Sequence, residues 1–119
     1  MQTTIFCRTK FEGTHCFPGA PDEVAYLREE HRHMFGVKVE MNVYHDNREV
    51  EFIMLKHFVD KCIRMNLTKG AQVAKLGATS CEQIATMLLA ELKDCYGTTR
   101  AITVTVDEDG ENGAVVYED

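Results

Sequence analysis

The stretch HRHMFGVKVEMNVY, residues 31–44, decides the fold. From Phe35 to Val43 every odd position is apolar, and the even positions carry a lysine, a glutamate, an asparagine and one glycine. Alternation with this period is typical of a β-strand that buries one of its faces. The sequence therefore predicts a strand here, with its odd-numbered side chains directed into the core.

Three further segments are predicted to be strands, and the first two of them alternate in the same way. Residues 5–12 (IFCRTKFE) form one of them, residues 102–106 (ITVTV) the second, and residues 114–117 the third. The last two are separated by the glycine-containing stretch 109–113, which is typical of a hairpin turn. The chain is therefore expected to contain a pair of strands near each end.

Between these pairs, residues 49–64 and 80–97 change to helical spacing. Apolar residues three or four apart form one stripe in each segment. Ser80 is the expected N-cap of the second helix, and Gly97 is expected to end it. Residues 68–77 are expected to be a connection. The order strand, strand, helix, helix, strand, strand predicts an α+β fold, with an antiparallel sheet and both helices packed on one face.

The bulk properties fit a single domain over residues 1–119. The net charge of −6 argues against nucleic-acid binding, which needs a basic surface. Apolar runs are far shorter than the roughly 20 residues of a membrane span, and we find no signal-peptide pattern at the N-terminus. The five cysteines form no CxxC pair and are expected to be reduced, with Cys7, Cys62 and Cys81 in the core. These features predict a cytoplasmic protein with a small-molecule ligand, and neither nucleic acid nor membrane as partner.

Three histidines share the inward parity. Extended backwards from Phe35, the odd face reaches His33 and His31, and the first strand continues in phase from Phe11 to His15. The Cα atoms of two residues that are two positions apart on a strand lie about 7 Å apart on the same face. A third imidazole from a neighbouring strand would complete a set of three on that face. Three nitrogen ligands and an open position are typical of a catalytic zinc site. The pattern is equally compatible with an alternative in which the histidines lie at a strand end, form hydrogen bonds and bind no metal.

Glu108 continues the inward parity of Ile102, Val104 and Val106. A carboxylate on a buried face needs a partner, because an unpaired buried charge is costly. A ring with adjacent N–H donors, such as an amino-pyrimidinone, would satisfy both oxygens. The alternative is that the strand ends by residue 107 and Glu108 is a solvated acid of the turn.

Five segments of the chain, in order, resemble motifs of the 6-pyruvoyl-tetrahydropterin synthase and 6-carboxy-tetrahydropterin synthase superfamily. FEGTHCF (11–17) resembles F-x-A-A-H-x-L, HRH (31–33) resembles H-G-H, EVEFIMLK (49–56) resembles M-V-x-D-F-x-x-L-K, SCEQIA (80–85) resembles T-x-E-N-I-A, and VTVDE (104–108) resembles V-x-V-x-E. The resemblance spans nearly the whole chain. It implies a tunnelling fold, in which ββααββ subunits form a homo-oligomeric barrel with active sites at subunit interfaces.

The resemblance also implies a site chemistry. Zinc would be held by His15, His31 and His33, and Glu108 would anchor a pterin ring. The implied function is that of a zinc-dependent carbon–oxygen lyase acting on a dihydroneopterin triphosphate-type substrate. Two alternatives remain open: a catalytically impaired pterin- or purine-binding protein of this fold, and a metal-dependent enzyme with a different purine-like substrate.

The chain departs from the family in its proton-transfer residues. The family's cysteine lies a few residues before H-G-H, where this chain has Leu27. Its Asp-His pair between the two helices has no counterpart in residues 64–79. The group that would move protons beside the metal is therefore missing or replaced.

Two residues are candidates for this catalytic role. Glu29 lies two positions before His31, on the same face if the strand begins that early. Family members that use a glutamate here place it at the position of Arg28, so Glu29, or its neighbour Glu30, is an approximate match. Cys16 is the nearest thiol, although alternation would turn it away from the face of the preceding histidine.

Overall fold

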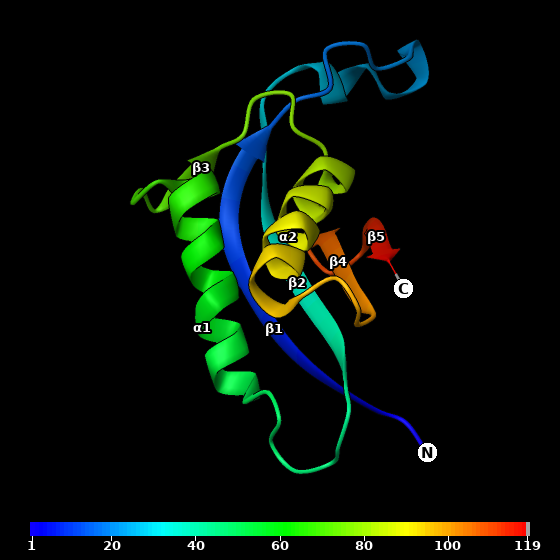
Figure 1. Ribbon diagram of the computed structural model, residues 1–119. Helices are drawn as coiled ribbons and strands as arrows, with labels where there is room; N and C mark the ends of the chain where they lie inside the picture. The colour runs from blue at the N-terminus through cyan, green and yellow to red at the C-terminus, as the bar shows by residue number, and fades with distance from the viewer. Residues whose placement is uncertain (119) are drawn as a thin grey trace.

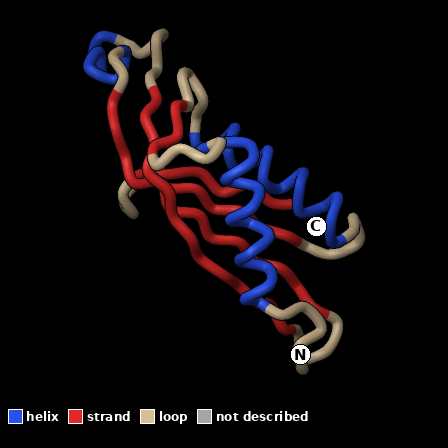
Figure 2. Tube along the Cα trace, turned by 90° about the vertical axis from the view of Figure 1, so that its left-hand side faces the viewer, coloured by secondary structure: helices blue, strands red, loops and turns tan. Residues whose placement is uncertain are grey.

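The structure, a computed structural model, describes residues 1–118 and has an α+β architecture. The strands are β1 (Thr3–His15), β2 (His31–Val43), β3 (Val73–Lys75), β4 (Ile102–Glu108) and β5 (Asn112–Glu118), in the sheet order β3-β1-β2-β4-β5. The helices are α1 (Phe52–Ile63) and α2 (Cys81–Tyr96), with a short 3-10 helix η1 (Asp22–Arg28) and a π turn η2 (Arg64–Thr68). Figures 1 and 2 show both α-helices on the same face of the curved sheet.

β1 and β2 form a long antiparallel pair that positions the candidate site. Their register places His15 opposite His31 and Gly13 opposite His33. The chain between these strands, which includes η1, extends beyond the end of the sheet (Figure 1). The three histidines therefore lie together at one end of the sheet, beside the loop that joins the two strands.

The expectation of an all-antiparallel sheet was wrong in one respect. β3 lies in the stretch 68–77, which was expected to be a connection, and it pairs in parallel with β1. Three residues are too few for an alternating pattern to be visible in the sequence. The backbone contact continues past β3, since Leu76 N donates to Thr14 O and Cys16 N donates to Gly77 O. This path brings the start of α2 next to His15.

The core lies between the sheet and the two helices. Its largest fully buried side chains are Phe35, Val39 and Met41 of β2, Leu55 and Val59 of α1, Ile84, Leu88 and Leu92 of α2, and Ile102, Val104 and Val106 of β4. The odd-numbered residues of β2 and the even-numbered residues of β4 thus face the helices, as the alternation predicted. Cys7, Cys62 and Cys81 are buried free thiols, which confirms the expectation for them.

The ends of α2 also agree with the sequence. The Ser80 hydroxyl accepts a hydrogen bond from Gln83 N and the Gln83 side chain accepts one from Ser80 N, which makes a capping box. Gly97 ends the helix with a positive φ of 98°, a backbone conformation that glycine adopts without steric cost. Within residues 1–118, no helix is long and apolar enough to cross a membrane.

Candidate metal centre

The structure brings His15, His31 and His33 together. One ligand nitrogen from each lies within 4.8 Å of the other two. The ring centroids are 4.7 Å apart for His15 and His31, 5.0 Å for His31 and His33, and 5.4 Å for His15 and His33. His15 is buried and the other two are half-buried, so the group lies at the edge of the core and remains accessible from one side.

Each of these rings is oriented through its Nδ1 atom. The acceptors are Thr79 O for His15 at 2.9 Å, Glu29 O for His31 at 2.9 Å, and Asp109 Oδ2 for His33 at 2.7 Å. Carbonyl and carboxylate oxygens only accept hydrogen bonds, so each Nδ1 carries the proton. This leaves the Nε2 atoms of His31 and His33 as the nitrogens available to a metal, whereas His15 Nε2 lies 2.9 Å from Glu108 Oε2 and becomes available only when that carboxylate withdraws.

His33 Nε2 provides a test of whether a cation fits. It is buried and has no hydrogen-bond partner among residues 1–118. A buried acceptor without a partner costs about 1–3 kcal/mol, which a bound cation would remove. Zinc–nitrogen bonds of about 2.0–2.1 Å place tetrahedral ligand nitrogens roughly 3.3 Å apart, so zinc would draw the rings slightly together. Three imidazoles that are each held at Nδ1 and share one end of the sheet suit this ion.

Glu108 adjoins the same nitrogens. Its Oε2 lies 2.9 Å from His15 Nε2, and its Oε1 lies 3.6 Å from His33 Nε2. β4 extends to Glu108, which pairs with Phe35 of β2, so the alternative of a solvated turn acid does not hold. The side chain is 28% exposed, which leaves the carboxylate open to a ligand on one side.

A cavity of about 540 Å³ opens beside the histidines. Its walls include His15, His31 and Glu108, together with the segment 78–83 at the start of α2. Ligand pockets for small organic molecules generally have volumes of about 300–1,000 Å³, so a fused bicyclic ring would fit. The cavity therefore joins a candidate metal position to a carboxylate that can accept two ring N–H groups.

The two predicted catalytic residues lie in different places. Cys16 lines the cavity, because β1 ends at His15 and the alternation that would turn Cys16 away does not continue. Glu29 is exposed and is not part of the cavity wall. Its backbone oxygen orients His31, a contact that no side-chain pattern in the sequence indicates.

A second thiol, Cys81, also lines the cavity. Burial raises its pKa to about 12, and the nearby carboxylate of Glu108 contributes in the same direction. Cys81 therefore stays protonated at neutral pH and is unsuited to act as a nucleophile or base.

Two further contacts of the histidine rings were missed by the sequence analysis. Thr79 acts through its carbonyl oxygen, which has no signature in the sequence. Asp109 looks like an ordinary acid of the turn after β4, and only the register of β4 against β2 brings it to His33. An acidic residue directly after Glu108 was the one visible signal for this contact.

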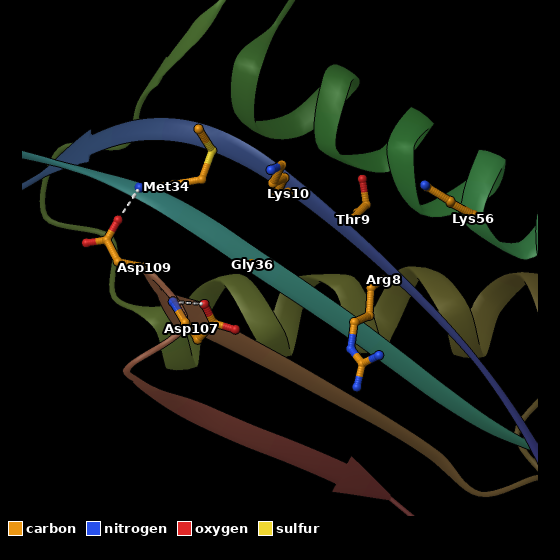
Figure 3. A pocket seen from close by; sticks show the side chains of 9 residues that line it. Arg8, Thr9, Lys10, Met34, Gly36, Lys56, Asp107 and Asp109 are labelled. Carbon is orange, nitrogen blue, oxygen red and sulfur yellow. Dashed lines mark hydrogen bonds between the residues drawn. The ribbon is translucent and has the colours of Figure 1, made fainter.

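A second hollow, of about 590 Å³, lies across β1, β2 and β4 (Figure 3). Arg8, Lys10 and Lys56 contribute positive charge to its wall, and Asp107 and Asp109 contribute negative charge. None of the three histidines lines it. It shares no histidine with the candidate metal centre and adjoins it through Asp109.

Comparison with known proteins gives a match in structure only. No protein-family model matches the chain, and no curated protein matches it in sequence. The 6-pyruvoyl tetrahydropterin synthase of Plasmodium vivax superposes with a TM-score of 0.71 at 14% identity, over 100% of this chain and 99% of that chain. For the Caenorhabditis elegans synthase the TM-score is 0.65 at 14% identity, over 100% and 97% of the two chains.

A third similar structure is a variant of the P. vivax synthase, described as a catalytic-residue mutant in which a glutamate is replaced by alanine. Its TM-score is 0.68 at 14% identity, over 100% of this chain and 99% of that chain. The protein therefore has the fold of the 6-pyruvoyl tetrahydropterin synthases, as the sequence motifs indicated.

Proposed function

We propose that this chain is a divergent, zinc-dependent enzyme of the 6-pyruvoyl- or 6-carboxy-tetrahydropterin synthase type, with a dihydroneopterin triphosphate-like substrate. The observation that carries the proposal is the convergence of His15, His31 and His33 beside Glu108 and a cavity of about 540 Å³. The shared fold supports the same conclusion.

The histidines and Glu108 would divide the work of binding. The Nε2 atoms of His15, His31 and His33 would hold the zinc ion, with each ring kept in place at Nδ1. Glu108 would accept two N–H groups of the substrate's amino-pyrimidinone ring and so orient the substrate side chain toward the histidines. Zinc, when bound, polarises substrate oxygens and stabilises negative charge that develops on them.

The proton would be moved by Glu29 or Cys16. A catalytic glutamate in the P. vivax enzyme supports a carboxylate in this role. The Glu29 backbone oxygen lies 2.9 Å from His31 Nδ1, which places this residue next to a proposed metal ligand, and as the base its exposed side chain would have to turn toward the cavity. Cys16 is already one of the residues that line the cavity. Either group would act as general base on the substrate side chain, a role generally worth about 100- to 10,000-fold in rate.

Assembly into a homo-oligomer is part of the proposal. Phe6, Val115 and Tyr117 lie on the sheet face away from the helices and are 52%, 57% and 67% exposed. Large apolar side chains grouped on one face favour burial against another subunit. We also propose a cytoplasmic location, which the five free cysteines support.

The decisive experiment measures metal and turnover together. Zinc is quantified by mass spectrometry in the purified wild type, in His31→Ala and His33→Ala, and in His57→Ala, which changes an exposed histidine of α1. We expect one zinc per chain in the wild type and in His57→Ala, and strong loss in the other two variants. Zinc that persists in both triad variants would exclude this site.

Turnover is then followed with dihydroneopterin triphosphate, with Glu29→Gln and Cys16→Ser alongside the wild type. Substitution of the residue that serves as the general base should lower kcat by about 100-fold or more. Tight pterin binding without turnover would instead favour the second candidate, a binding protein. One observation supports that candidate: residues 64–79 contain no histidine, aspartate or glutamate that could replace the family's Asp-His pair.

A further inference from the structure

His33 differs from the other two histidines in how it is held. At Nδ1, backbone carbonyl oxygens orient His15 and His31, whereas a carboxylate orients His33. We propose that Asp109 is a positioning residue, which fixes the ring and the tautomer of His33 and thereby presents its Nε2 to the metal. The metal part of this inference rests on the proposed function, and the state of the His33 ring can be tested without it.

The Asp109 carboxylate is held by both of its oxygens. Oδ2 accepts from His33 Nδ1 at 2.7 Å, and Oδ1 accepts from Met34 N at 2.8 Å, a bond visible in Figure 3. Asp109 N donates in turn to Met34 O at 2.8 Å. Hydrogen bonds that join its backbone and both of its oxygens to β2 hold the carboxylate facing His33. This makes the contact a fixed part of the site.

The local backbone explains how Asp109 reaches the ring. Glu108 pairs with Phe35, so the next residue of the chain comes to lie beside Met34 and His33. β4 ends at Glu108, and Asp109 adopts a φ of 58° in the left-handed region. Aspartate, asparagine and glycine are the residues that enter this region most readily. An aspartate here thus combines an unusual backbone conformation with a carboxylate at the imidazole.

A carboxylate partner has a chemical effect that a carbonyl partner lacks. A negative charge at Nδ1–H increases electron density on the ring and makes Nε2 a stronger donor to a cation. The Asp109 carboxylate makes this contact with Nδ1 of His33 at 2.7 Å. His33 is therefore the ring of the three whose Nδ1–H is polarised by a carboxylate.

Asp107 offers a matched control on the same hairpin. Its Oδ1 accepts from Gly110 N at 2.7 Å, so it also stabilises the turn after β4. No hydrogen bond or ion pair links it to a histidine within residues 1–118. A change at Asp107 reports the cost of loosening the hairpin, and a change at Asp109 adds the loss of the His33 contact.

The test compares Asp109→Gly, Asp109→Asn and Asp107→Asn with the wild type. Glycine removes the carboxylate and keeps the left-handed backbone, whereas asparagine keeps the shape and removes the charge. Zinc affinity is measured by competition with a chelator. We expect Asp109→Gly to bind zinc about 10- to 100-fold more weakly and Asp109→Asn to show a smaller loss, with Asp107→Asn within about twofold of the wild type. Equal losses in the Asp107 and Asp109 variants would overturn the proposal.

The second readout is nitrogen NMR of the His33 ring in the zinc-free protein. The wild type should show one tautomer, protonated at Nδ1, and Asp109→Gly should show a mixture of tautomers. Retention of the single tautomer in Asp109→Gly would overturn the proposal. If the wild type binds no zinc, the proposed function fails, and the NMR comparison still decides whether Asp109 fixes the His33 ring.

Discussion

Glu108 Oε2 and His15 Nε2 lie 2.9 Å apart, although their strands, β4 and β1, are not neighbours in the sheet. β2 lies between these strands, and both side chains reach past it on the face that the helices cover. His15 Nε2, which we propose binds the metal, is thus in contact with the Glu108 carboxylate, which we propose binds the substrate ring. Zinc binding would require Glu108 to withdraw from His15 or to become a further ligand.

Glu108→Gln should separate substrate recognition from metal binding. The variant loses the negative charge that two ring N–H groups would share, and hydrogen bonds to charged groups are worth about 1.5–3 kcal/mol. We expect pterin affinity to fall about 10- to 100-fold in a fluorescence titration, with zinc still bound at one per chain. Unchanged pterin affinity would remove Glu108 from the substrate site.

Zinc should raise the melting temperature through the histidine cluster. A ligand at 100 times its Kd adds about 2.7 kcal/mol to the free energy of unfolding. For a chain of 119 residues this corresponds to a rise in Tm of roughly 10 °C. Differential scanning calorimetry should show the rise in the wild type and in His57→Ala, and little of it in His31→Ala. An equal rise in all three proteins would mean that zinc binds elsewhere.

Phe35→Ala should weaken both the core and the metal centre. The Phe35 side chain is fully buried, with its ring centroid 5.3 Å from that of Phe11 and 5.1 Å from that of His15. Removing a buried phenyl ring costs about 3–5 kcal/mol of the free energy of unfolding. Urea denaturation measures this loss, and Phe35→Leu should lose markedly less.

The control for that change is Phe52→Ala, at the start of α1, where the side chain is 53% exposed. A surface substitution of this kind is expected to alter stability by about 0.5 kcal/mol or less. Comparable losses at Phe35 and Phe52 would contradict the core assignment.

Acid should destabilise the far end of the sheet through Glu49. Hydrogen bonds from the Tyr44 N–H and from Arg100 lower the pKa of Glu49 in the folded protein. Its stabilising contribution is complete above the unfolded-state pKa, about 4.3, and is lost as the pH falls through the lower folded-state pKa. The free energy of unfolding of Glu49→Gln should therefore fall less between pH 5 and pH 3 than that of the wild type. Parallel pH profiles for the two proteins would contradict this role.

Local alternation was sufficient for much of the architecture and for part of the site. Because successive side chains on a strand point to opposite faces, the parity of Phe35 to Val43 predicts which side of the sheet is buried. The same parity, continued along two strands, places His15, His31 and His33 on one face, and the structure brings them within 4.8 Å of one another. The same parity predicted that Glu108 points inward, and in the structure its carboxylate lies beside His15 on that face.

Alternation failed where a segment was too short or had left the strand. β3 has three residues, and its parallel pairing with β1 joins parts of the chain about 60 positions apart. Cys16 lies one residue beyond β1 and lines the cavity because the strand geometry has ended. No local pattern contains either piece of information.

The sequence by itself determined the inward face, the helices and the three histidines, because these depend on the period of neighbouring residues. Only the tertiary structure decided what holds each ring: Thr79 O, Glu29 O and the Asp109 carboxylate. Two of these acceptors are backbone oxygens, which every residue has, and the third depends on the register of β4 against β2. Hydrogen-bond partners of this kind are set by where distant segments meet, and the order of side chains along the chain does not encode that directly.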